Sequence, residues 1–130
     1  MGNYHSVNMP KRLLIIEDDP DILEILNLIF NEEGYEVVLS ENDEASYHIH
    51  EIMPDLVLLD IRLLNSRQNG DAICSRLKSQ PETKRFPVIL LSAELNLPSI
   101  GLSCGADGWI SKPFDIIELT QQVKALLYPS

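Results

Sequence analysis

Acidic side chains follow two short apolar segments of this sequence. Glu17, Asp18 and Asp19 come directly after the run Leu-Leu-Ile-Ile, and Asp60 comes directly after Leu-Val-Leu-Leu. If the two runs are neighbouring parallel strands, their carboxyl ends place these acids at one edge of a sheet. Carboxylates that close repel one another in a partly desolvated cleft, and a hard divalent cation such as Mg²⁺ relieves the repulsion. The pattern therefore predicts a Mg²⁺ site at this edge.

Two further polar residues end apolar runs and would reach the same edge. Ser92 follows Val-Ile-Leu-Leu, and Lys112 lies shortly after Gly-Trp-Ile. A free oxygen of Asp60 could then attack phosphorus and form an aspartyl phosphate. Mg²⁺ and the Lys112 ammonium would balance the charge on the transferring group, while Ser92 donates a hydrogen bond. One acid at a strand end is typical of a cap or a solvated loop, but these residue types together favour phosphoryl chemistry.

The elements that would position these residues alternate between short apolar runs and amphipathic segments. Strands are expected at residues 13–16, 35–39, 56–59, 87–92 and 108–110. Helices are expected from the N-cap Asp19 to Gly34, weakly over 45–52, after Gly70 around 73–77, and from Asp115 to Leu127. This alternation indicates an α/β fold in which a parallel sheet is covered by helices on both faces.

The segment from Glu94 to Cys104 is ambiguous, because Pro98 and Gly101 interrupt any regular helix. One helix face cannot bury all of its apolar residues, and exposed apolar patches usually mark interaction sites. We therefore expect a partner surface here, the alternative being that most of these residues line the core. The residues concerned are Leu95, Leu97, Ile100 and Leu102.

The composition describes an acidic globular chain. Its 10 basic and 20 acidic residues give a formal net charge of −10, which repels phosphate backbones and argues against direct nucleic-acid binding. No apolar run reaches the ~20 residues of a membrane helix. Cys74 and Cys104 match no metal or redox spacing, so we expect buried, reduced thiols in a cytoplasmic protein. Residues 1–10 are expected to be a flexible leader and residues 11–130 one domain.

Four motifs occur in order along the chain. They are Leu-Leu-Ile-Ile-Glu17-Asp18-Asp19-Pro, Pro54-Asp-Leu-Val-Leu-Leu-Asp60, Pro87-Val-Ile-Leu-Leu-Ser92-Ala93 and Gly105-Ala-Asp-Gly-Trp-Ile-Ser-Lys112-Pro113-Phe114. With this order and spacing the chain, from about Lys11 to Leu127, resembles the receiver domains of response regulators in two-component systems. The resemblance implies a doubly wound, flavodoxin-like receiver fold with a five-stranded parallel sheet of strand order 2-1-3-4-5.

The resemblance also assigns the metal ligands. It implies that Asp18 binds Mg²⁺ directly and that Glu17 acts through water. Asp60 matches the phosphoacceptor of the family and also binds the metal. The backbone carbonyl of Arg62 should complete the site.

Three further positions match residues that act on the phosphoryl group or transmit the signal. Ser92 matches the switch hydroxyl, and Lys112 matches the phosphate-binding lysine, whose bond to Pro113 is cis in the family. Trp109 falls at the switch-aromatic position, where tyrosine or phenylalanine is more usual. A buried core role is the competing interpretation for Trp109.

The function that the resemblance implies is signalling. A sensor histidine kinase or a histidine phosphotransfer protein would donate the phosphoryl group to Asp60 in a Mg²⁺-dependent reaction. The domain would then change conformation and signal to a downstream effector protein through protein contacts. It would not be a turnover enzyme, because it assists only its own phosphorylation and dephosphorylation. A homodimer that forms on phosphorylation is a further partner to consider.

One departure from the family pattern lies beside the predicted site. The loop after Asp60 is longer than the usual Leu-Pro-Gly-x-Asp-Gly and lacks its proline. This departure bears on phosphorylation kinetics and partner choice more than on the fold.

Two alternatives to a phosphorylated receiver remain. A phosphatase of the haloacid dehalogenase type would use Asp19 and Asp21, whose spacing fits, although Pro20 and Asp21 resemble the first turn of a helix. A pseudo-receiver would keep the fold as a binding module alone. The pseudo-receiver would show no Mg²⁺-dependent response to acetyl phosphate or beryllofluoride.

Overall fold

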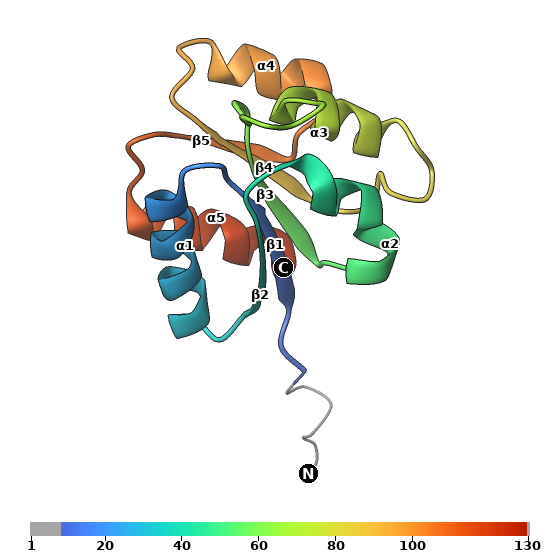
Figure 1. Cartoon of the computed structure of the whole chain (residues 1–130). Helices are drawn as coiled ribbons and strands as arrows, with labels where there is room; N and C mark the ends of the chain where they lie inside the picture. The colour runs from blue at the N-terminus through green and yellow to red at the C-terminus, as the bar shows by residue number, and fades with distance from the viewer. Residues whose placement is uncertain (1–8, 130) are drawn as a thin grey trace.

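Five parallel strands form one sheet in the computed structural model, which describes residues 9–129 (Figure 1). The strands are β1 (Arg12–Ile16), β2 (Glu36–Ser40), β3 (Leu56–Asp60), β4 (Val88–Ser92) and β5 (Gly108–Ser111). Their order across the sheet is β2-β1-β3-β4-β5, which confirms the expected doubly wound topology. Most of the expected flexible leader, residues 1–8, lies outside the described residues.

Helices pack against both faces of the sheet and enclose two apolar cores. The helices α1 (Pro20–Glu32) and α5 (Ile116–Leu127) cover one face (Figure 1). The helices α2 (Ile49–Ile52), α3 (Gly70–Lys78) and α4 (Leu97–Cys104) cover the other. The central strands β3 and β4 are buried at every position, whereas the edge strand β2 is partly exposed. Each fully buried leucine of β3 and β4 contributes roughly 1.5–3 kcal/mol relative to an exposed one.

Short connections keep the polar residues at the carboxyl edge of the sheet. Asp19 accepts hydrogen bonds from two backbone N–H groups of the first turn of α1, and Pro20 opens that helix. Gly34, with φ of 92°, follows the end of the helix as expected of a C′ residue. The helix therefore begins immediately after the acidic residues that follow β1. This short connection keeps their side chains at the carboxyl edge of the sheet.

The ambiguous segment before Cys104 contains a regular helix, α4. Pro98 stands in its first turn, where a backbone N–H has no intrahelical acceptor and proline is tolerated. Gly101 is buried against the ring of Trp109. Both residues that argued against a helix are therefore accommodated, one by its position in the helix and the other by tertiary packing.

The apolar residues around α4 divide between core and surface. Leu97 is 1% exposed, so the expectation of a partner surface is wrong for this residue. Ile100 is partly buried against the core. Leu95 and Leu102 are exposed. A helix of this length presents only one stripe to the sheet, which explains why Leu97 is buried and Leu102 is exposed. Leu95 precedes the helix.

The weak helix expected over residues 45–52 is two elements. A 3₁₀ helix, η2 (Asp43–His48), precedes the single turn of α2. Met53 ends that turn in the left-handed conformation, with φ of 52°. η2 includes Asp43, a buried carboxylate that the sequence patterns did not single out.

The two cysteines are buried free thiols, as expected from their spacing. The Cys74 thiol donates to the backbone carbonyl of Cys104 at 3.4 Å, and burial raises its pKa. Within residues 9–129 no helix combines the length and the apolar character needed to cross a membrane.

Candidate functional site

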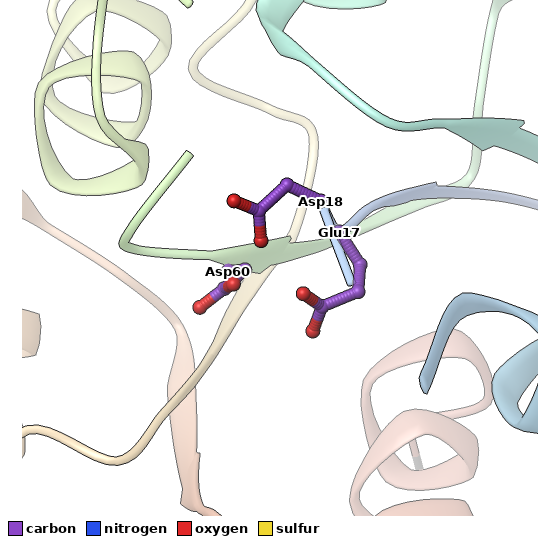
Figure 2. A group of neighbouring side chains, drawn as sticks. All are labelled: Glu17, Asp18 and Asp60. Carbon is purple, nitrogen blue, oxygen red and sulfur yellow. The ribbon is translucent and has the colours of Figure 1, made fainter. Parts of the chain in front are cut away.

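The carboxyl edge of the sheet brings together the acidic residues expected from the sequence. Asp60 is the last residue of β3, and Glu17 and Asp18 directly follow β1, which pairs with β3 in register. One carboxylate oxygen from each of the three lies within 4.8 Å of the others. Figure 2 shows the three carboxylates converging on the end of β3. The expected acidic site is therefore present.

An open cleft of about 500 Å³ lies over this cluster. Glu17 is 1% exposed and Asp60 is 6% exposed, while Asp18 is half-buried at the rim. The predicted residues Ser92 and Lys112 also line the cleft. Glu17 and Asp60 are therefore more buried in the cleft than Asp18.

Lys112 follows β5 and extends its ammonium over the cluster. Its Nζ lies 2.7 Å from Oε1 of Glu17 and 3.4 Å from Oδ2 of Asp60. Burial by itself would lower the pKa of Lys112, but these carboxylates outweigh burial and raise it, so the side chain is cationic. The peptide bond from Lys112 to Pro113 is cis, as the family resemblance implied.

The charge of the cluster is only partly neutralised. Burial, and then the hydrogen bond and charge of Asp60, raise the pKa of Glu17 above its usual range, although Lys112 acts in the opposite direction. Three crowded carboxylates with a single ammonium carry an excess of negative charge in a low-dielectric cleft. Oxygen ligands with excess negative charge fit a hard divalent cation such as Mg²⁺.

Backbone groups orient two of the acids. Asp18 accepts a hydrogen bond from the N–H of Leu64 at its Oδ2 (2.9 Å). Glu17 accepts one from the N–H of Asp19 at its Oε2 (3.1 Å). The segment after β3 therefore contacts Asp18 directly, which the sequence patterns did not reveal.

The two expected switch residues lie on neighbouring strands. Ser92 ends β4, is 2% exposed, and accepts a hydrogen bond from the N–H of Glu94 at 3.1 Å. Trp109 pairs with Leu90 in the β4–β5 register, two residues before Ser92. Residues two apart on a strand share a face, so the Ser92 hydroxyl and the indole lie on the same side of the sheet. Trp109 is half-buried against the core beneath α4.

An ion pair across the mouth of the cleft was not expected. Arg62, from the segment after β3, places its Nε 3.1 Å from Oε2 of Glu94, from the segment after β4. The resemblance had implied a role only for the Arg62 backbone carbonyl. The pair joins residues far apart in the sequence, so no local pattern could have indicated it.

The phosphatase alternative does not match the geometry. Its nucleophile would be Asp19, but that carboxylate caps α1 by accepting from the N–H groups of Asp21 and Ile22. Asp21 is exposed in the first turn of the helix. Among the described residues the carboxylates that converge on the cleft are Glu17, Asp18 and Asp60 instead.

A doubly wound sheet with an acidic cluster, a hydroxyl and a lysine at its carboxyl edge defines the receiver class of signalling domain. The chain belongs to the response regulator receiver domain family, whose model matches residues 13–124. It is therefore a receiver domain of two-component systems. The expectation drawn from the four sequence motifs is confirmed.

Two proteins with similar sequences are regulators. The chain is 37% identical over 122 residues to the phosphate regulon transcriptional regulatory protein PhoB of Rhizobium meliloti (strain 1021), covering 92% of this chain and 53% of that protein. It is 34% identical over 122 residues to the DNA-binding response regulator MtrA of Mycolicibacterium smegmatis, covering 92% of this chain and 51% of that protein. The chain thus spans about half the length of these curated relatives.

A solved receiver structure superposes closely. It is the signal receiver domain of a signal transduction histidine kinase from Syntrophus aciditrophicus, with a TM-score of 0.82 and 36% identity. The match covers 90% of this chain and 89% of that one. Receiver domains of this shape therefore occur in kinases as well as in transcriptional regulators.

Proposed function

We propose that this receiver domain takes a phosphoryl group onto Asp60 in a Mg²⁺-dependent reaction and changes conformation in response. The observation that carries the proposal is the convergence of Glu17, Asp18 and Asp60 within 4.8 Å, with the Lys112 ammonium 3.4 Å from Asp60. Such a site combines a nucleophilic carboxylate with oxygen ligands for a cation and a fixed positive charge.

The proposed metal ligands combine this acidic cluster with the roles that the family resemblance implies. Asp18, Asp60 and the Arg62 backbone carbonyl would hold Mg²⁺, and Glu17 would act through a bound water. When bound, Mg²⁺ would offset the negative charge of the transferring phosphoryl group. Burial first, and then the hydrogen bond and charge of Asp60, raise the pKa of Glu17. A cation near this carboxylate would favour its charged form and so offset the shift.

The chemical step belongs to Asp60. One of its carboxylate oxygens forms a bond to phosphorus while the bond from phosphorus to the donor imidazole nitrogen breaks, and the imidazole leaves. Lys112 is already 3.4 Å from Oδ2 of Asp60 and can pair with a phosphoryl oxygen. The Ser92 hydroxyl, at the end of the adjacent strand, can donate a hydrogen bond to another.

The proposed partners follow from this chemistry. The donor is the phospho-histidine of a sensor histidine kinase or a histidine phosphotransfer protein, and the output is contact with a downstream effector protein or a second copy of the domain. The formal net charge of −10 supports protein contacts over direct binding of nucleic acid by this domain. The free thiols of Cys74 and Cys104 are compatible with action in the cytoplasm.

Intact-mass analysis tests the phosphoacceptor. Incubation with acetyl phosphate and Mg²⁺ should add one phosphoryl group to the wild type and none to Asp60→Asn. Asp19→Asn is the matched control, because it removes the same charge beside the cleft and asparagine is an equally good helix cap. It should be labelled normally. Labelling of Asp60→Asn would refute the assignment, and a wild type that takes up no phosphoryl group would support the pseudo-receiver alternative.

A further inference from the structure

A second polar network lies beside the acidic cleft, around the buried carboxylate of Asp43 in η2. Asp43 is 4% exposed. Its Oδ2 accepts hydrogen bonds from the Tyr47 hydroxyl (2.8 Å) and from the backbone N–H groups of Arg67 (3.0 Å) and Gln68 (3.2 Å). Its own N–H donates to Oγ of Ser66 (3.0 Å). Three consecutive residues of the segment after β3 are thus tied to one residue of η2.

Two arginines lie against Tyr47, whose hydroxyl donates to this carboxylate. The ring of Tyr47 lies 4.3 Å from Cζ of Arg67 and 4.4 Å from Cζ of Arg76. Arg76 in turn donates from Nη2 to Oγ of Ser46 (2.7 Å) and from Nε to Oε1 of Gln68 (2.9 Å). Removing a buried charge with so many partners leaves several donors without an acceptor.

The segment that Asp43 holds also reaches the acidic cleft. Residues 61–69 connect β3 to α3 without a helix or strand of their own. At one end of this segment the N–H of Leu64 donates to Oδ2 of Asp18 (2.9 Å). At the same end, Arg62 lies on the wall of the cleft. Asn65, between the two contact points, has φ of 56° and turns the chain from one to the other.

We propose that Asp43 is a positioning residue for the metal site. By fixing residues 66–68 it holds the Leu64 N–H against Asp18 and keeps Arg62 at the wall of the cleft. The hydrogen bond to Oδ2 of Asp18 leaves the other oxygen of that carboxylate for the cation. This inference rests on the proposed Mg²⁺ site. It means that the longer loop after β3 helps to position a metal ligand.

Metal affinity and backbone exchange together test the role. Mn²⁺ is a suitable probe, since unbound Mn²⁺ is quantified directly by electron paramagnetic resonance. Asp43→Ala should weaken Mn²⁺ binding about tenfold, in line with the loss of other groups that orient metal ligands. In the absence of metal, amide hydrogen exchange at Leu64, Arg67 and Gln68 should become faster. Asp43→Asn, which keeps a neutral acceptor, should restore part of both properties.

A control variant that loses a different buried hydrogen bond distinguishes a positioning effect on the metal site from a general loss of stability. Thr83 is 2% exposed and donates to the carbonyl of Leu77 (2.6 Å), between α3 and the start of β4, at the opposite end of the sheet from the cleft. Thr83→Ala should lower stability and leave Mn²⁺ affinity unchanged. If Asp43→Ala does not fold, Asp43→Asn carries the test, with an expected loss of a few-fold in affinity.

The outcomes are distinguishable. Wild-type affinity in Asp43→Ala would overturn the positioning role while leaving the metal site intact, and so would unchanged exchange at Leu64. No Mn²⁺ binding by the wild type, or equal binding by Asp18→Asn, would instead refute the metal site and the role that depends on it. A loss of affinity in Thr83→Ala equal to that in Asp43→Ala would also overturn the role.

Discussion

The indole ring of Trp109 occupies the space that any side chain at Gly101 would need. A Cβ at position 101 would lie 2.2 Å from Cε3 and 2.8 Å from Cζ3 of the ring. Trp109 belongs to β5 and Gly101 to α4, so this contact joins the sheet to the helix beside the cleft. The position of the indole and the position of α4 therefore depend on one another.

Gly101→Ala should displace the indole. Overpacking of this kind costs about 1–3 kcal/mol, and the preference of roughly 1 kcal/mol for alanine over glycine in a helix offsets it only in part. Trp109 is the only tryptophan of the chain, so its emission should shift to longer wavelength as the ring meets more water. Ser103→Ala, at an exposed position of α4, is the control. An unshifted emission in Gly101→Ala would show that α4 moves instead of the ring.

Ser92 should couple phosphorylation to Trp109. A phosphoryl group on Asp60 presents acceptor oxygens that draw the Ser92 hydroxyl from its present bond with the N–H of Glu94. Beryllofluoride with Mg²⁺ should therefore change the emission of the wild type beyond the effect of Mg²⁺ alone. Ser92→Ala should lose most of that extra change. A full response in this variant would show that Trp109 senses the site without the hydroxyl.

Asp18→Asn should melt at a higher temperature than the wild type in the absence of metal. Removing one of three crowded carboxylates relieves repulsion of about 1 kcal/mol, which corresponds to roughly 3–5 °C. Mg²⁺ should raise the melting temperature of the wild type by mass action but scarcely affect the variant. Asp19→Asn should respond to Mg²⁺ as the wild type does. Equal gains in wild type and Asp18→Asn would mean that Asp18 is not a ligand.

The stabilising effect of Asp43 should depend on pH. Burial alone would raise its pKa, but the Tyr47 hydroxyl, the Gln68 and Arg67 N–H groups and the Arg67 charge outweigh burial and lower it. A lowered pKa contributes stability that is complete above the ordinary value of about 3.9 and is lost as pH falls through the folded-state pKa. In urea unfolding, the gap between wild type and Asp43→Asn should be larger at neutral pH than near pH 3. The gap for Thr83→Ala should not change, since a hydroxyl does not titrate there.

Local patterns were sufficient for most of the fold. Apolar runs long enough for one strand each, separated by amphipathic segments with a cap at Asp19 and a glycine at position 34, can satisfy their burial only as a covered parallel sheet. The carboxyl ends of parallel strands necessarily share an edge. The placement of Glu17, Asp18, Asp60, Ser92 and Lys112 at one edge thus followed from parallel strands and needed no side-chain detail. The order of the strands came from the resemblance to receiver domains.

The sequence failed where a residue's environment comes from distant parts of the chain. From local sequence alone, Gly101 is expected to interrupt a helix. In the structure α4 requires a small residue there because the Trp109 ring lies against it. Asp43 reads as an ordinary acid near a turn, yet it is buried and holds residues more than 20 positions away.

What the sequence by itself determined was the alternation of strands and helices, the apolar stripe of each helix, and the identity of the polar residues that end the strands. These properties depend on periodicity and capping, which act within a few residues. Only the tertiary structure decided the Arg62–Glu94 ion pair, the anchoring of the long loop by Asp43, and the fit of Trp109 against Gly101. Those depend on distances between side chains far apart in the chain, and packing sets such distances only after the whole sheet and its helices have assembled.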